Sequence, residues 1–500
     1  MNKLMKRIGA LALSTVVWMG AAITTCAKDD NYTYNYDWWG DVQDSPDFYT
    51  VTGVYTSVEL ELDKKMNTPS GMCVKDNLVY VCDTGNNRIL VFERNDKGEL
   101  KLKREFDRFQ GDVEVNTFSA PTDIAVSDEG DIYIADGGNA RILKLDKNLN
   151  YQMQFIKPVE NTITEETIFL PNKIDIDTTG RVYCVATGIN KGIIKYEADG
   201  SFSGFVGANK VSFNWTDYIY KKFATQEQRD RMESFVPTEY DNIYMDYEGF
   251  IYACKGNQTQ EALEEDGAAA VRRLNLLGND ILVQNGEWGV YGDLYMGEGG
   301  GYEGPSSFID VTGLENDVYF CLDKKRGRIF SYDDQGNIMF VCGGGQSPMD
   351  GYFKSPIAID HIGTDLLVLD MLDCSITTFT LTEFGSLVFK AMDQFDQGEY
   401  DASGATWEEV MKLNGNYDRA YIGIGRSLLR QEKYKEAMDY FELKYDAENY
   451  SKAFKQYRKQ WVEEHIGLIV LVILALFLIP MGIGKVKAIK HEIDIADIFK

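Results

Sequence analysis

The chain has 500 residues, of which 44% are hydrophobic and 13% aromatic, so it can hold several domains and bury a large core. Its formal net charge of −27 argues against a nucleic-acid partner, because phosphate binding needs clustered Lys and Arg. Only three His and eight Cys are present, which leaves little material for a metal centre or a disulfide framework. We therefore expect no cofactor and no metal ligands, although a divalent cation belongs to one alternative considered below.

Residues 1–27 have the pattern of a signal peptide, in which three basic residues precede the apolar run 8–23. Cleavage after Ala27 and lipidation of Cys26 both fit this pattern, and the sequence does not decide between them. Residues 28–64 form an aromatic-rich N-terminal segment. We expect this segment to cap or staple the domain that follows it.

Residues 65–384 contain six related segments. Each opens with a Pro before a short apolar strand, continues through a turn into a second strand of the form apolar-Tyr-apolar-small-Asp, and ends in a third strand. The opening prolines at Pro121, Pro171, Pro237, Pro305 and Pro356 sit at the starts of their strands. Pro is tolerated at strand starts because its missing N–H costs least there. One such unit cannot bury both of its faces, whereas six arranged radially can. The sequence therefore predicts a mainly β fold, a six-bladed β-propeller over residues 65–384.

Charged residues recur at fixed positions in these segments. The second-strand Asp precedes an Arg by five residues in three pairs, which are Asp83 and Arg88, Asp136 and Arg141, and Asp323 and Arg328. Carboxylates also recur in the first strands, at Asp123, Asp175, Asp241, Asp310 and Asp360. Both sets could line a ligand site. Their periodic repetition favours a structural role, with each Asp–Arg pair fixing one hairpin.

The repeat pattern resembles the NHL-repeat family, and the resemblance is clearest in residues 120–145. It covers roughly residues 65–390 and implies a six-bladed propeller. Propellers of this kind include binding scaffolds, lactonases and lyases, so the resemblance does not settle function.

Two insertions interrupt the repeats, at residues 211–235 and 282–303, and the first contains a predicted helix at about 216–234. Insertions in repeat folds gather on one face, which is often the binding face. The candidate ligand- or partner-binding residues are Trp215, Tyr218, Tyr220, Trp288, Tyr291, Tyr295 and Tyr302. The alternative is that these rings attach the insertions to the propeller.

After the sixth segment the spacing of apolar residues becomes helical. A 34-residue period over residues 385–446 resembles a pair of tetratricopeptide units, with Gly425, Ala437 and Phe441 at the spacings expected for packed helices. A further helix over residues 450–464 completes a helical stalk, 385–464. Such helix pairs normally serve protein contacts.

Residues 466–484 carry no charge and consist mostly of large aliphatic side chains, which predicts a transmembrane helix at 465–484. Lys485, Lys487 and Lys490 follow this run and place the tail, 485–500, in the cytoplasm. Together with the leader, this predicts a single-pass cell-membrane protein with an extracellular N-terminal ectodomain.

The order of leader, NHL-like propeller, helix pair and single span resembles proteins that accompany carbohydrate ABC transporters in Gram-positive bacteria. The resemblance implies a scaffold that binds a ligand or protein, with a sugar-transporter permease or an oligosaccharide as its partner. The alternative is a propeller lactonase or lyase that holds a divalent metal in its central channel. No GxSxG, HExxH or phosphate-loop motif is present, so we expect no enzyme.

Overall fold

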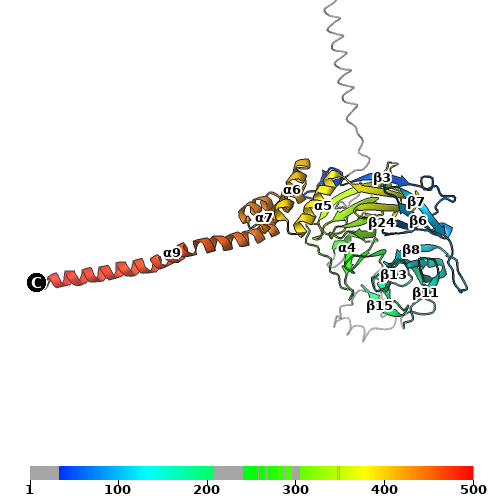
Figure 1. Ribbon diagram of the computed structural model, residues 1–500. Coiled ribbons are helices and arrows are strands. Elements are labelled where there is room, and N and C mark those ends of the chain that lie inside the picture. The colour runs from blue at the N-terminus through cyan, green and yellow to red at the C-terminus, as the bar shows by residue number, and fades with distance from the viewer. Residues whose placement is uncertain are drawn as a thin grey trace, which may run out of the picture. The chain divides into compact units, whose positions relative to one another are not determined.

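The computed structural model describes residues 33–160, 163–207, 240–256, 258–264, 269–286, 288–294, 304–345, 347 and 349–498 (Figure 1). The predicted signal peptide and the helix predicted at 216–234 lie outside the described residues. The chain divides into two compact units, Met1–Ser386 and Leu387–Lys500. Each unit is described by itself.

Among its described residues, the first unit contains six sheets of mainly antiparallel strands. The first sheet is β4 (Gly71–Lys75), β5 (Leu78–Asp83), β6 (Arg88–Arg94) and β7 (Leu100–Phe106). The second is β8 (Pro121–Val126), β9 (Ile132–Asp136), β10 (Arg141–Leu145) and β11 (Tyr151–Phe155). The third is β12 (Leu170–Ile176), β13 (Val182–Thr187), β14 (Ile193–Tyr196) and β15 (Phe202–Val206). One-turn 3-10 helices, η1 (Thr84–Asn86) and η2 (Gly137–Asn139), connect the middle strands of the first two sheets.

The fourth sheet has three strands among the described residues, β16 (Asn242–Met245), β17 (Ile251–Cys254) and β18 (Val271–Leu274), with the short helix α4 (Gln260–Glu264) between the last two. The fifth contains β19 (Phe308–Gly313), β20 (Tyr319–Asp323), β21 (Arg328–Tyr332) and β22 (Ile338–Gly345), with β23 (Tyr352–Phe353) beside β22. The sixth contains β24 (Pro356–Ile362), β25 (Asp365–Asp370) and β26 (Ser375–Leu381).

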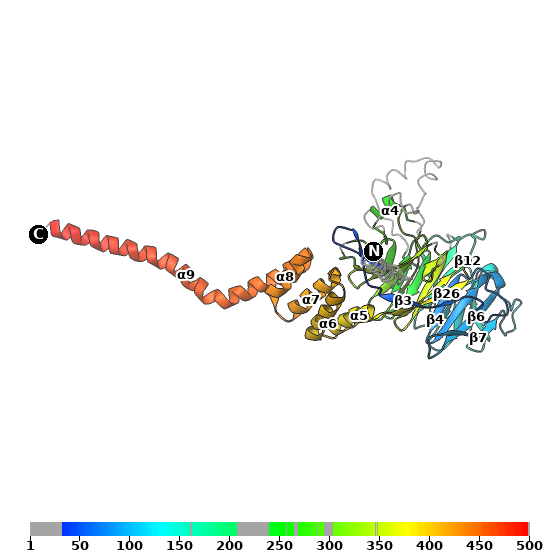
Figure 2. The same ribbon diagram turned by 90° about the horizontal axis from the view of Figure 1, so that it is seen from above.

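The first strands of the six sheets form a closed ring. Strands β4, β8, β12, β16, β19 and β24 each contact the next one in chain order, and β24 contacts β4. The fold is therefore the predicted propeller, and each sheet is one blade (Figure 2). The insertion at 211–235 joins the last strand of the third blade to the first strand of the fourth. The insertion at 282–303 follows β18, the third strand of its blade, whose last residue Leu274 pairs with Ile251, so it starts from the opposite end of that blade.

The N-terminal segment completes two blades. Strand β3 (Tyr49–Tyr55) pairs with β26 and becomes the fourth strand of the sixth blade, so the first and last parts of the propeller share one sheet. The hairpin β1 (Tyr34–Tyr36) and β2 (Val42–Asp44) adds two strands beyond β22 of the fifth blade. The sequence predicted a cap or staple here but not a strand shared with the last repeat.

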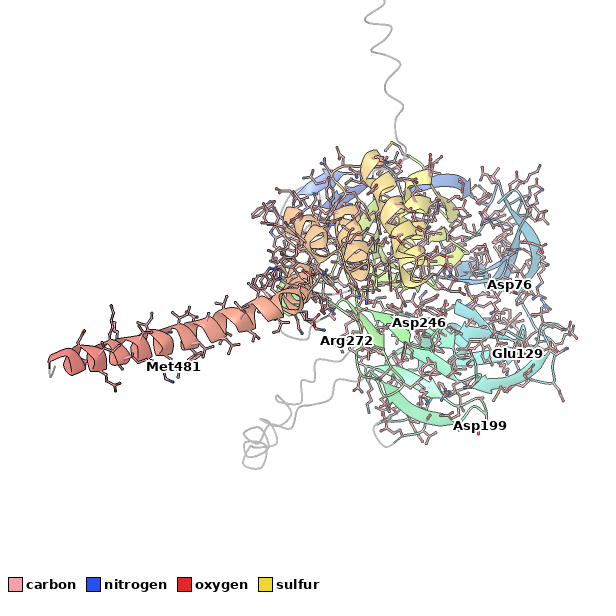
Figure 3. The ribbon with its side chains drawn as sticks, turned by 60° about the vertical axis from the view of Figure 1, so that its left-hand side comes forward. Asp76, Glu129, Asp199, Asp246, Arg272 and Met481 are labelled. Atoms are coloured by element: carbon pink, nitrogen blue, oxygen red, sulfur yellow. The ribbon has the colours of Figure 1, made fainter. Side chains whose placement is uncertain are left out.

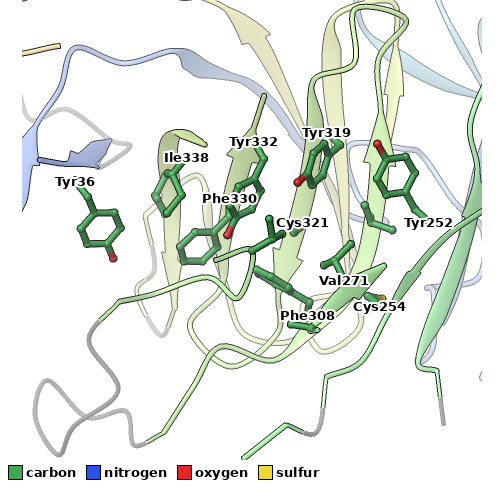
Figure 4. Packing of buried hydrophobic residues seen from close by; sticks show 14 of the residues in the cluster. Tyr36, Tyr252, Cys254, Val271, Phe308, Tyr319, Cys321, Phe330, Tyr332 and Ile338 are labelled. Carbon is green, nitrogen blue, oxygen red and sulfur yellow. The ribbon is translucent and has the colours of Figure 1, made fainter. Parts of the chain in front are cut away.

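Successive residues of the inner strands β5, β9 and β20 are buried on both faces of their blades, and they pack between neighbouring blades. In the cluster between the fourth and fifth blades, Tyr319 lies between Tyr252 and Tyr332, with ring centroids 5.2 and 5.4 Å away (Figure 4). These rings come from β17, β20 and β21, so one row of aromatic side chains joins two blades.

The second unit is helical. Helix α5 (Glu383–Asp396) crosses the boundary between the units, and α6 (Tyr400–Leu413), α7 (Asp418–Arg430) and α8 (Tyr434–Leu443) follow, each packed on the next. A Cβ at Gly423 would lie 2.4 Å from the Trp407 ring, and one at Gly425 would lie 2.6 Å from the Phe441 ring. Only glycine allows these helices to approach so closely.

Helix α9 (Ala447–Ile498) continues without interruption through Pro480. It contains a window with a mean hydropathy of 3.0, no part of which is buried, and it is long and apolar enough to cross a membrane. This agrees with the span predicted at 465–484.

Phe48 provides a test of the N-terminal closure. Its ring is fully buried, and it stacks on Phe340 of the fifth blade at 4.1 Å and contacts Phe384 edge-on at 4.9 Å. Phe48→Ala is expected to lower the free energy of unfolding by ~3–5 kcal/mol, measured by denaturant unfolding. Val58→Ala, at a 71% exposed position of the same segment, should change it by less than about 0.5 kcal/mol. Equal effects of the two substitutions would contradict a role of the N-terminal segment in closing the propeller.

Candidate functional site

Acidic side chains of the first strands bridge neighbouring blades around the propeller axis. Each first strand has a hydrogen-bonded neighbour on one side only, so its other edge carries backbone N–H groups that need acceptors. In these blades an acceptor is a carboxylate from the preceding blade. The recurrence of Asp in the first strands therefore has a direct structural cause.

Two of these bridges join the second, third and fourth blades. Asp123 accepts the N–H of Ile174 at 2.9 Å. Asp175 accepts the N–H of Met245 at 2.6 Å, and its second oxygen accepts the N–H of Ile176 in its own strand at 2.8 Å.

Two further bridges complete the far side of the ring. Asp310 accepts the N–H of Ile359 at 2.8 Å and the side-chain amide of Asn242 at 2.6 Å, so it joins three blades. Asp360 accepts the N–H of Val74 at 2.6 Å and joins the sixth blade to the first. The last of the predicted first-strand carboxylates, Asp241, precedes β16 and accepts the N–H of Gly256 in its own blade instead.

The junction between the first two blades is built differently. Gly71 stands where the second blade has Asp123, and a Cβ there would lie 2.5 Å from the Asp123 carboxylate. Ser70 instead donates to the carbonyl of Thr122 at 2.8 Å. The buried Lys173 reaches over the second blade to the carbonyl of Ser70, at 3.1 Å, and lies 3.8 Å from Asp123.

Burial is the largest cause of the pKa shifts of the aspartates in this ring. It raises the pKa of Asp310 to about 7 and that of Asp175 to about 7, while the backbone N–H groups that they accept act in the opposite direction. Burial also raises the pKa of Asp123 and of Asp360. Burial alone would lower the pKa of Lys173, but the charges of Asp123 and Asp310 outweigh it, so this pKa is raised and the ammonium balances part of the negative charge.

Sequence reasoning missed Lys173 and Asn242 as members of this ring. The repeat pattern contained the signal, because Lys173 follows Pro171 by two residues as Asp123 follows Pro121. A basic residue at a position that is acidic in the neighbouring repeat predicts a charge pair across the junction.

The predicted hairpin pairs form in the first two blades. Arg88 Nε lies 2.7 Å from Asp83, and Arg141 Nε lies 2.9 Å from Asp136. The other carboxylate oxygen of Asp136 accepts the N–H of Ser119, in the segment that enters the blade, at 2.7 Å. These aspartates and arginines are buried and fix the hairpin to the entry segment.

The third pair is a correction. Asp323 lies 3.7 Å from Arg326, whereas Arg328 pairs with Asp293 of the insertion and donates to the Tyr34 hydroxyl at 2.9 Å. A second carboxylate, brought in by the insertion, therefore takes the arginine that the repeat pattern assigned to Asp323. The Tyr36 hydroxyl donates to the same Asp293 at 3.0 Å, which ties the N-terminal hairpin to the insertion.

Two of the seven predicted aromatic binding residues, Trp288 and Tyr291, fall among the described residues. The ring of Trp288 packs over Gly40, and Tyr291 packs on the apolar cluster between the fourth and fifth blades. Both therefore contribute to the attachment of the insertion. Trp215, Tyr218, Tyr220, Tyr295 and Tyr302 lie outside the described residues.

The chemistry available at the axis is limited by these contacts. Within the described ranges, no group of three or more His, Cys, Asp and Glu side chains is arranged to hold a metal ion. His361 lies 2.9 Å from the Thr312 hydroxyl, beside Asp360. The cysteines at positions 73 to 374 are free thiols, and five of the seven are buried.

Comparison with protein families identifies NHL repeats at residues 66–92 and 118–145. These are the first three strands of the first and second blades, where the Asp–Arg pairs form. The class defined by the fold is thus a β-propeller that contains NHL repeats. No curated protein matches the sequence.

Several solved structures resemble the chain at low identity. Virginiamycin B lyase from Staphylococcus aureus is 11% identical, with a TM-score of 0.38 over 67% of this chain and 100% of the lyase. A streptogramin B lyase is 14% identical, with a TM-score of 0.40 over 68% and 100%. A putative gluconolactonase is 10% identical, with a TM-score of 0.37 over 66% and 92%. Scores this low support no inference about activity.

The pKa of Asp310 gives a test of the ring. The unfolded chain releases this proton near pH 4 and the folded chain near pH 7, so the folded state holds the extra proton between these values. The contribution of Asp310 to stability is therefore full below about pH 4 and is lost as the pH rises toward 7.

The free energy of unfolding of the native protein minus that of the Asp310→Asn variant should accordingly be larger at pH 5 than at pH 8, by on the order of 1–3 kcal/mol. Denaturant unfolding at both pH values measures it. The exposed Glu129, in the turn between β8 and β9 (Figure 3), provides the control, because Glu129→Gln should show no such pH-dependent difference. A difference that is independent of pH for Asp310→Asn would contradict the raised pKa.

Proposed function

We propose that this protein is a membrane-anchored extracytoplasmic propeller that acts as a binding scaffold, accessory to carbohydrate transport. The observation that carries the proposal is α9, one continuous helix that leads from the helical unit into a window of mean hydropathy 3.0 with none of it buried. Such a helix supports a membrane anchor that holds the folded units beside the bilayer. Its three lysines after the apolar run support a cytoplasmic tail.

The scaffold role is supported by how the acidic side chains at the propeller axis are used. Asp123, Asp175, Asp310 and Asp360 each accept a backbone N–H of the next blade, so they serve the junctions between blades. A general acid or base must reach the substrate proton instead. We therefore favour binding over a lactonase or lyase activity.

The partner in this proposal is a sugar-transporter permease, with an oligosaccharide as a ligand that the propeller presents. The tetratricopeptide-like spacing of residues 385–446 suits contact with a protein. The insertions between the third, fourth and fifth blades suit the ligand, because insertions in repeat folds often carry the binding surface.

The anchor is testable by substitution. The full-length chain should remain in the membrane fraction after an alkaline carbonate wash. Leu474→Arg combined with Leu478→Arg should release it, because an Arg near the centre of a span costs ~2.5–3.5 kcal/mol. Leu443→Arg, at an exposed position of α8, is the matched control and should remain bound.

The topology is testable with a protease. Protease added to intact cells should degrade the propeller, and protection of the propeller would contradict the proposed topology.

The ligand is tested by calorimetry of the detergent-solubilised full-length chain against a panel of oligosaccharides, with and without Ca²⁺. We expect saturable binding that Trp215→Ala weakens at least about tenfold, since loss of a stacked ring costs on the order of 1–3 kcal/mol. A flat response across the panel would favour a scaffold with protein partners alone. Turnover of a lactone substrate would contradict the scaffold proposal in favour of the enzyme.

A further inference from the structure

Two tryptophans stand at the tip of the N-terminal hairpin. Strands β1 and β2 are joined by a turn in which the Gly40 N–H donates to the carbonyl of Asp37 at 3.0 Å, so Trp38 and Trp39 are its central residues. Such positions usually hold polar residues, glycine or proline. Trp is normally well buried, yet Trp39 is 71% exposed and Trp38 is 37% exposed. A residue that departs from the local rules and adds so little to the core is a candidate for function.

Side-chain hydrogen bonds brace the backbone of this turn. The Asp37 carboxylate accepts the N–H of Trp39 at 2.8 Å and the N–H of Asp41 at 3.0 Å. It also accepts the side-chain amide of Gln43 at 3.2 Å. Gly40 has a φ of 79°, the left-handed conformation that closes a hairpin loop of this kind. A ring carried on a preorganised turn loses less conformational entropy when it binds a ligand.

The tip lies against the insertion that precedes the fifth blade. A Cβ at Gly40 would lie 3.3 Å from the Trp288 ring and 3.5 Å from the Leu294 side chain. The Tyr36 hydroxyl of the same hairpin donates to Asp293 of this insertion at 3.0 Å. The hairpin and the insertion are therefore packed together, and Trp39 stands at their surface.

The charge around the tip favours one class of ligand. Residues 29–63 contain no Lys, Arg or His, and the carboxylates nearest in sequence are Asp37, Asp41, Asp44 and Asp47. Carboxylates repel an acidic sugar and the phosphates of an anionic bilayer. They accept hydrogen bonds from hydroxyl groups, and Asp41 is exposed at the end of the turn. A neutral ligand that combines an apolar ring face with hydroxyl groups fits these conditions.

We propose that Trp39 stacks on a pyranose ring of a neutral oligosaccharide, while the Asp41 carboxylate accepts hydrogen bonds from the hydroxyl groups of the sugar. The face of the indole is negative, and the C–H groups on one face of a pyranose ring are apolar and weakly positive, so the two faces attract each other. The site deepens the proposed function, and the choice of a saccharide rests on it. Trp39 is not among the seven aromatic binding residues predicted from the sequence.

The experiment titrates the detergent-solubilised full-length chain by calorimetry with maltotriose, cellotriose, xylotriose and the acidic trigalacturonate. We expect saturable binding of at least one neutral trisaccharide and none of trigalacturonate. Trp39→Ala should weaken the binding at least about tenfold because the stacked ring is lost, and Trp39→Phe should retain most of it. Trp461→Ala, at a 46% exposed position of α9, is the matched control and should bind as the native protein does.

Chemical modification provides a second measurement that needs no variant. N-bromosuccinimide should oxidise the exposed indole of Trp39, and the bound trisaccharide should slow this oxidation but not that of Trp461, as measured by peptide mass spectrometry. In vesicles that contain phosphatidylglycerol, without sugar, Trp39 should react as fast as it does in detergent. Protection by these vesicles would overturn the site in favour of a contact with lipid.

The remaining outcomes distinguish this site from the proposed function. A neutral trisaccharide that binds the native chain and Trp39→Ala equally, or that leaves the oxidation of Trp39 unchanged, would overturn the site and leave the oligosaccharide ligand in place. Saturable binding of trigalacturonate would overturn the assignment to a neutral sugar. Lack of binding by every probe at up to about 10 mM would overturn the site and leave the membrane anchor and a scaffold with protein partners.

Discussion

The propeller depends on acceptance of the backbone N–H groups at the inner edge of each blade. A sheet that ends at a crowded axis has an edge with no neighbouring strand, and buried N–H groups without acceptors cost more than most single contacts provide. Asp123, Asp175, Asp310 and Asp360 place a carboxylate at that edge from the preceding blade. The same hydrogen bonds join each blade to the next one. One set of contacts therefore both closes the ring and gives the strand edges their acceptors.

Collecting carboxylates around one axis creates repulsion that the fold has to relieve. Lys173 contributes one compensating charge, Asn242 replaces a fifth carboxylate with a neutral donor, and Gly71 removes a side chain altogether. Burial is the main reason that the pKa of Asp310 is still raised to about 7, and the charge of Lys173 acts against it. The departures from the repeat pattern are therefore as necessary to the ring as its regular members.

The local sequence pattern was enough to predict the blades, the helical unit and the long apolar helix. Pro, Gly and the spacing of apolar residues determine these elements within a few residues. It did not predict that β3 joins β26, since the two strands are more than 300 residues apart and nothing in the Tyr49–Tyr55 segment identifies its neighbour. The Asp323–Arg328 pair was predicted wrongly for a related reason: Asp293 competes for Arg328 from an insertion.

The sheet order of the sixth blade bears on how the protein carries a mechanical load. Strand β26 lies between β25 and β3, and the chain passes from β26 directly into α5. A pull applied through the helical unit therefore reaches the sheet through a strand that is hydrogen-bonded on both sides. Two rows of hydrogen bonds have to break before such a strand leaves the sheet, whereas a strand at an edge is held by one. The N-terminal strand thus strengthens the blade to which a tether at the C-terminal end of the chain would transmit force.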